Sequence, residues 1–303
     1  MKKSILFTLA LLATSVFGHA QYNSCAGKSE VYETTTKDVR NETTGKIEKV
    51  VVQEKVKNTD TYGNASGNQY DLAVDGAFEG QTIVVLQFCM EGSFELPKEA
   101  LAEKGFSVYR FSKVAPSPEV LEEALSKACQ LWVISTTTQL LNEEHAEVIK
   151  KFFDSGKGVY LWGDNDPYHA DVDFLAGKLV GVSLSGRYMG TKNVRFKTDS
   201  TNCGMLPNHL ITTGLEFVYE GITISKINDP KQNMTPLIWS SDGNVVTAVY
   251  ENQGQRLIID GGFTRLFHNW DTAGTGRYVK NAAAWLVNYE RFGEAVVSEN
   301  LEK

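Results

Sequence analysis

The chain has 303 residues, of which 22% are charged, and its formal net charge is −7. Because it is acidic and has no cluster of basic residues, nucleic acids and anionic membrane surfaces are excluded as partners. After the N-terminal segment no apolar run approaches the roughly 18 residues that a spanning helix needs, so the sequence predicts no membrane span.

Residues 1–20 have the pattern of a secretory signal peptide. A short basic start is followed by an apolar run from Ile5 to Phe17. Gly18-His19-Ala20 then supplies small residues suited to cleavage before Gln21. We therefore expect an exported protein, periplasmic or secreted.

Four cysteines follow the expected cleavage point, and an oxidising compartment allows them to form disulfides in three possible pairings. Cys89 and Cys129 belong to apolar strand segments, which predicts burial in the core. Cys25 and Cys203 lie in polar surroundings and could pair with each other. No cysteine or histidine spacing indicates a zinc site.

Residues 21–78 form a polar N-terminal extension with too few large apolar residues for a core of its own. Ser29–Thr36 and Ile47–Val56 have strand character, and the sequence NETTG between them predicts a hairpin. The extension either packs on the main domain or is partly disordered.

Residues 79–292 predict one α/β domain, and residues 293–303 are a polar tail. Apolar strand segments alternate with helices of 10–15 residues, a rhythm typical of βαβ units. The predicted fold is a flavodoxin-like, doubly wound, mostly parallel sheet. The strand segments are 82–88, 106–111, 130–136, 159–163, 194–197, 222–224, 237–241, 245–251 and 255–262. The helices are 96–105, 117–128, 141–158, 171–181 and 275–292.

Several side chains in these elements have a structural interpretation. Asn142 is expected to cap the helix that follows it, and His145 on that helix is expected to be solvated. Trp162 and Trp285 are expected in the core. For His209 we expect a structural hydrogen bond.

Ligands of open α/β sheets bind beyond the carboxyl ends of the strands, and polar residues of this chain gather there. The strand 159–163 runs directly into a turn rich in carboxylates, and a second polar group follows the strand 255–262. The predicted ligand-binding residues are Asp164, Asn165, Asp166, Tyr168, His169, Arg265, His268 and Asp271.

The second half of the chain also resembles a known superfamily. The segments HLITTGLEFVYEGITIS and GRYVKNAAAWLV, and above all the closing strand from Gly254 to Gly261-Gly262-Phe263, resemble class I glutamine amidotransferase-like proteins. The resemblance covers about residues 80–290 and implies the same doubly wound fold.

In that superfamily a cysteine nucleophile lies on the turn after one strand, which corresponds to VYLWG in this sequence. A His-Pro-Glu sequence follows a later strand, which corresponds to GGFTRLF. Here the turn reads Gly163-Asp164-Asn165-Asp166, and GGFTRLF is followed by no His-Pro-Glu. Since the thiol and its partners are missing, the resemblance implies no glutamine hydrolysis.

Three interpretations of the carboxylates stay open. Asp164 or Asp166 could act with His268 as the base or nucleophile and the acid of a hydrolase. Asp164 or Asn165 could instead cap the helix 171–181, with Asp171 in its first turn.

The third interpretation is an ion site. Asp164, Asp166, His169 and Asp171 offer ligands for calcium or another divalent metal, although their spacing fits no EF-hand, and the sequence calls for no other cofactor.

Arg265 is expected either to bind the ligand or to pair with Asp164 or Asp166. The mixture of rings and polar groups at Tyr168 and His268 suits carbohydrates. The hypotheses for function are therefore a non-catalytic amidotransferase-like protein that binds a small molecule, glycan or protein, a hydrolase, and an envelope interaction protein that acts through its extension.

Overall fold

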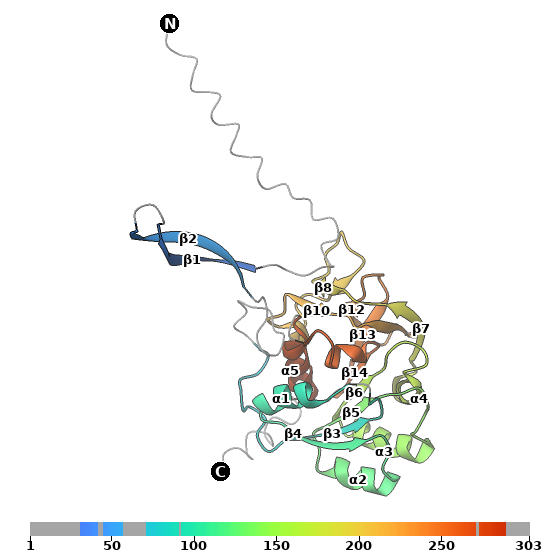
Figure 1. The fold of residues 1–303 in the computed structure, drawn as a ribbon. Coiled ribbons are helices and arrows are strands. Elements are labelled where there is room, and N and C mark those ends of the chain that lie inside the picture. The colour runs from blue at the N-terminus through green and yellow to red at the C-terminus, as the bar shows by residue number, and fades with distance from the viewer. Residues whose placement is uncertain (1–30, 42–44, 57–70, 91, 271–272, 289–303) are drawn as a thin grey trace.

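The computed structural model describes residues 31–41, 45–56, 71–90, 92–270 and 273–288. Its centre is an eight-stranded sheet with helices on both faces, and a separate hairpin stands away from it (Figure 1). The predicted signal peptide and the polar tail lie outside the described residues. Within the described residues, no helix is both long and apolar enough to cross a membrane.

The central sheet confirms the predicted doubly wound, mostly parallel architecture. Its first five strands are parallel and its last three are antiparallel to their neighbours. In order across the sheet the strands are β4 (Ser107–Ser112), β3 (Thr82–Gln87), β5 (Gln130–Ile134), β6 (Gly158–Trp162), β14 (Gln255–Asp260), β13 (Val245–Asn252), β12 (Thr235–Trp239) and β9 (Gly204–Met205).

Two apolar cores cover the two faces of this sheet because successive residues of a strand point to opposite sides. Ile83 and Val85 of β3 face one core, while Val84 and Leu86 face the other. The first core is covered by α1 (Glu95–Glu103) and α5 (Thr275–Leu286). The second is covered by α2 (Pro118–Ser126), α3 (Glu143–Asp154) and α4 (Ala170–Val180).

The starts of α2 and α3 follow the sequence signals. Ser117 caps α2 and Asn142 caps α3, as predicted. His145, which we expected in solvent, is buried: its backbone N–H donates to Asn142 Oδ1, and its Nε2 lies 2.7 Å from the carbonyl oxygen of Pro116. The prediction for His145 was wrong because the residue completes a capping box that turns its ring inward.

Smaller pairs of strands lie beside the main sheet in the second half of the chain. The sequence predicted parts of two of these strands but missed Ser183–Met189, whose half-exposed residues give no apolar run, and the three-residue Phe217–Tyr219. The pairs are β7 (Ser183–Met189) with β11 (Thr223–Asn228), and β8 (Asn193–Arg195) with β10 (Phe217–Tyr219). The 3₁₀ turns are η1 (Leu210–Thr212) and η2 (Phe263–Leu266).

The predicted N-terminal hairpin is confirmed. β1 (Val31–Arg40) and β2 (Ile47–Val56) pair antiparallel in a two-stranded sheet. Val39, Ile47, Val50 and Val51 are exposed on it. Two-stranded hairpins are marginally stable in water, so the hairpin depends on its cross-strand pairs.

A cluster of ion pairs fastens the end of the extension to the domain. Asp71 Oδ2 lies 2.8 Å from Lys104 Nζ and 3.1 Å from Lys280 Nζ, and Asp71 Oδ1 lies 2.6 Å from Arg277 Nε. Burial alone raises the pKa of Asp71, but the ion pairs outweigh it and lower the pKa to about 2. The ring of Phe78, a few residues on, stacks on Phe106 at 4.6 Å.

We expect Asp71→Asn to lower the free energy of unfolding at pH 7 by about 1–2 kcal/mol, because the shift in pKa favours the folded state and partial exposure screens it. The sign follows from a pKa that is lower in the folded state: the stabilisation is complete above pH 4 and is lost as the pH falls towards 2. Urea denaturation at pH 7 and pH 2 measures it. The exposed Asp199→Asn is the control, and an equal loss for both variants would contradict the role of the cluster.

The cysteines behave largely as expected. Cys89 and Cys129 are buried thiols, and Cys203 is disulfide-bonded. The predicted partner, Cys25, lies outside the described residues.

Candidate functional site

The turn after β6 differs from a nucleophile elbow. It runs from Gly163 to His169 before α4 begins at Ala170, and no residue in it has a left-handed φ. A nucleophile elbow needs a strained, sharp turn directly between strand and helix, so that the nucleophile projects beside backbone donors. This longer loop holds its first carboxylate, that of Asp164, in the interior of the protein.

Asp164 is held inside the protein by three separate segments. Its Oδ1 accepts hydrogen bonds from Thr223 Oγ1 and from the Asn165 N–H, both at 2.7 Å, and its Oδ2 accepts one from the Thr264 N–H at 3.3 Å. Only 1% of the residue is exposed. Burial raises the pKa of Asp164 to about 6, although these hydrogen bonds oppose the rise. Asp164 therefore joins the turn, β11 and η2 from within.

The predicted helix-capping role of Asp164 and Asn165 was wrong. His169 is the N-cap residue of α4, and no side chain caps this helix. Asn165 Oδ1 accepts from Thr223 Oγ1 instead. Asp171 lies in the first turn of α4 as predicted, but its Oδ1 accepts from the backbone N–H groups of Leu140 and Leu141. These carboxylates and amides connect loops at the sheet edge.

Arg265 pairs with neither Asp164 nor Asp166, contrary to prediction. Its side chain is fully buried, and Nη1 lies 3.3 Å from Asp260 Oδ2. Its Nη2 donates to the carbonyl oxygen of Glu220 at 2.9 Å. With no exposed surface, Arg265 lies beneath the sheet edge and supports it.

A buried hydroxyl network completes the surroundings of Asp260. Its Oδ2 accepts hydrogen bonds from Tyr278 Oη at 2.9 Å and Thr247 Oγ1 at 3.0 Å, and its Oδ1 accepts one from the Gly262 N–H. Burial raises the pKa of the Tyr278 hydroxyl well above its usual range, so the group stays a neutral donor. Asp260 and Arg265 thus form a buried ion pair, and both carboxylate oxygens of Asp260 also accept hydrogen bonds.

The remaining predicted residues lie at or near the surface. Asp166 and His268 are exposed, and Tyr168 and His169 are half-buried. Within the described structure the two ring nitrogens of His169 are buried and have no hydrogen-bond partner. Asp271 lies outside the described residues.

A row of rings connects two of these surface residues. The ring of Tyr168 meets Phe263 edge-on at 6.3 Å, Phe263 lies 6.1 Å from Phe267, and Phe267 lies 5.1 Å from His268. Gly92, in the loop after β3, packs so closely on the Phe267 ring that a Cβ there would fall 2.1 Å from it. The aromatic row, defined as Tyr168, Phe263, Phe267 and His268, therefore joins the loops after β6 and β14.

Sequence reasoning missed the residues that organise this site. Thr223 and Thr264 hold Asp164, and Phe263 and Phe267 bridge Tyr168 to His268. The phenylalanines in GGFTRLF were a visible signal, because two rings four residues apart directly follow a buried strand.

The predicted metal ligands Asp164, Asp166, His169 and Asp171 do not converge. In the part of the chain that the structure describes, one set of three potential metal ligands lies close enough to share an ion. It consists of the carboxylates of Asp71, Asp75 and Glu103. The ammonium groups of Lys104 and Lys280 already lie among these oxygens, at 2.6–3.1 Å. Side-chain cations therefore neutralise the set.

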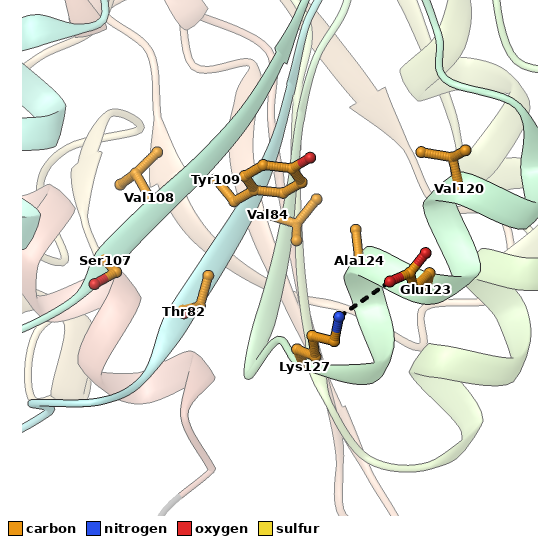
Figure 2. Close-up of a pocket in the computed structure, with 9 residues that line it drawn as sticks. All are labelled: Thr82, Val84, Ser107, Val108, Tyr109, Val120, Glu123, Ala124 and Lys127. Carbon is orange, nitrogen blue, oxygen red and sulfur yellow. Dashed lines mark hydrogen bonds and ion pairs between the residues drawn. The ribbon is translucent and has the colours of Figure 1, made fainter.

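Two hollows on the surface lie away from these residues. One, of about 480 Å³, lies between β4 and α2 and includes Tyr109 and Val120 (Figure 2). The other, of about 420 Å³, lies around η1 and includes Asn208 and His209. Beside this second hollow His209 accepts a hydrogen bond from the Ile211 N–H, which is the structural role expected for it.

Comparisons with known proteins give likenesses of structure. No protein-family model matches the chain, and no curated protein matches it. A protein assigned as a GMP synthase subunit from Thermoplasma acidophilum aligns with 71% of this chain and 98% of its own, at 13% identity and a TM-score of 0.47.

Two longer glycosidases align over about a third of their length. The β-galactosidase from Rahnella sp. R3 matches 69% of this chain and 32% of its own, at 12% identity and a TM-score of 0.44. The exo-β-1,4-mannosidase Op5Man5 from an Opitutaceae bacterium, strain TAV5, matches 73% and 35%, at 11% identity and a TM-score of 0.35. No activity follows from likenesses at this level, and function has to be argued from the site.

Proposed function

We propose that this is an exported, non-catalytic binding protein of amidotransferase-like fold that recognises a carbohydrate at the carboxyl edge of its sheet. The observation that carries the proposal is the aromatic row from Tyr168 to His268. The apolar C–H faces of sugars stack on rings, while their hydroxyl groups bond to polar side chains around the rings.

The surroundings of the row supply such polar groups. Asp166, two residues before Tyr168 in the chain, is exposed, and so is Asn269, the residue after His268. Both ends of the row therefore combine a ring with a hydrogen-bonding side chain. Phe263 is 1% exposed and belongs to the core, so in this proposal the sugar stacks on Tyr168, Phe267 or His268.

The geometry argues against the hydrolase alternative. All oxygen contacts of Asp164 go to Thr223, Asn165 and Thr264, and within the described residues none goes to His268. A general base must reach the proton that it removes, directly or through one water molecule. With 1% of its surface exposed, Asp164 is poorly placed for that task.

Isothermal titration with a panel of neutral hexose oligosaccharides tests the proposal. We expect one member of the panel to bind, and Tyr168→Ala and His268→Ala each to weaken binding at least about fivefold, since a lost stacking contact is worth about 1 kcal/mol or more. Phe174→Ala, which removes a ring on α4 that lies under Lys178, serves as the control and should bind as the unaltered protein does.

Two outcomes would refute the proposal. If no member of the panel binds, the carbohydrate interpretation is wrong. If the bound oligosaccharide is cleaved, or if ammonia is released from glutamine, the protein is an enzyme and the buried position of Asp164 has been misread.

A further inference from the structure

The strand β4 ends the main sheet with an open side. Among the described strands its only neighbour is β3, to which it pairs in regular parallel register over six residues. The N–H groups of Ser107 and Lys113 donate to carbonyl oxygens of Gln81 and Gln87 on the β3 side. The backbone N–H and C=O groups of successive residues in a strand point to opposite sides of the strand. Those of Val108, Arg110 and Ser112 therefore point outward, away from β3.

This edge lacks the features that usually keep sheet edges apart. Ser107–Ser112 contains no proline and no bulge, and its one charged residue is Arg110. Arg110 Nη1 donates to Gln87 Oε1 at 2.8 Å, and its Nη2 lies 4.0 Å from Glu95 Oε1, so its charge is drawn back towards the protein. Unprotected edges of this kind pair with other strands.

An apolar groove runs beside the open edge. In Figure 2, Tyr109 of β4 faces Val120 and Ala124 of α2, with Val84 of β3 between them. Tyr109 is 52% exposed and Val120 is 46% exposed, so two large apolar side chains border the groove in solvent. The edge thus offers backbone hydrogen bonds with an apolar hollow alongside, the combination by which strands add to a sheet.

We propose that a second copy of this chain occupies the edge, with the two β4 strands paired antiparallel about a two-fold axis into one continuous sheet. Pairing centred on Arg110 would place two guanidinium groups opposite each other, which is unfavourable. Pairing centred on Tyr109 sets Val108 opposite Arg110 of the other copy, and these outward groups exchange four hydrogen bonds.

The side chains near the proposed two-fold axis are compatible with the same side chains of a second copy. The two Tyr109 rings meet as a cross-strand aromatic pair and cover the two grooves. On the rim of each groove Glu123 Oε1 lies 3.1 Å from Lys127 Nζ, so each rim carries both signs of charge. A rim that carries both signs presents little net charge to a second copy, whereas rims of one sign would repel each other.

Sedimentation velocity of the purified protein at rising concentration tests the proposal. We expect a dimer, and we expect Tyr109→Asp to raise its dissociation constant at least about 100-fold, because two carboxylates would meet on the axis. Arg110→Pro should act similarly without harming β3, since the lost N–H points outward. Met189→Asp, at an equally exposed apolar residue on β7, is the control and should leave the dimer unchanged.

Disulfide trapping tests the register. Tyr109→Cys should form a covalent dimer on oxidation, because non-hydrogen-bonded residues facing each other lie about 4.5 Å apart between Cα atoms. Ser112→Cys should not, since its expected neighbour is residue 106 of the other copy. A monomer at every concentration, or a dimer that Tyr109→Asp leaves intact, would overturn the proposal. It does not depend on carbohydrate binding.

Discussion

Arg265→Met is expected to lower the free energy of unfolding by about 3–5 kcal/mol, the cost of removing one partner of a buried ion pair. Arg265 has no exposed surface and its partner, Asp260, has none either. Once the guanidinium is gone, the carboxylate of Asp260 keeps its hydroxyl and amide donors but loses its counter-charge. The hydrogen bond to the Glu220 carbonyl oxygen is lost as well.

A double-mutant design separates charge from packing. Asp260→Asn in the Arg265→Met background removes the unpaired charge and should recover part of the lost stability. Arg187→Met is the control, because the exposed Arg187 donates to the carbonyl oxygen of Asp166 at the surface and should change stability by less than about 1 kcal/mol. A loss below about 1 kcal/mol for Arg265→Met, by urea denaturation, would show that Asp260 is not a buried charge.

The stability difference between the unaltered protein and Asp164→Asn is expected to depend strongly on pH. The folded protein raises the pKa of Asp164 from 3.8 to about 6. An acid with a raised pKa binds its proton more tightly in the folded state, so its contribution is most favourable below pH 4 and is lost as the pH rises through 6. The full shift corresponds to about 3 kcal/mol, of which about 2 kcal/mol is lost between pH 4 and pH 7.

Denaturation curves at pH 4 and pH 7 measure this difference directly. Asp164→Asn cannot ionise, so the unaltered protein should lose about 2 kcal/mol relative to it over this interval. Asp166→Asn, at the exposed carboxylate two residues away, is the matched control and should give no such change. Equal differences at both pH values would mean that Asp164 is solvated in the folded protein.

Local patterns predicted the elements of the domain well. Seven of the eight central strands were visible as short apolar runs, the two-residue β9 being the exception, and Ser117 and Asn142 marked helix starts by side-chain chemistry that acts within one turn. The alternation of strands and helices then predicted the parallel sheet. In contrast, β7 has a mixed, half-exposed pattern because it pairs only with β11 at the side of the sheet. Such a strand gives no periodic signal.

The candidate site was predictable in position but not in its detailed contacts. The sequence correctly put carboxylates at the end of β6, since adjacency along the chain fixes where a residue lies. It could not show that Asp164 turns inward, because the groups that hold it lie 59 and 100 residues further on. Arg265 was misplaced because its side chain turns inward to Asp260 at the end of β14 and to the carbonyl oxygen of Glu220, which lies 45 residues away in the sequence.

The cluster around Asp71 has a mechanical consequence. Asp71 links the start of the folded domain to α5, its final helix, and to Lys104 at the end of α1. A pull applied through the N-terminal extension would reach these bonds before it reached β3. The ion pairs would yield first under such a load, and the hydrogen bonds between the central strands would be shielded from tension.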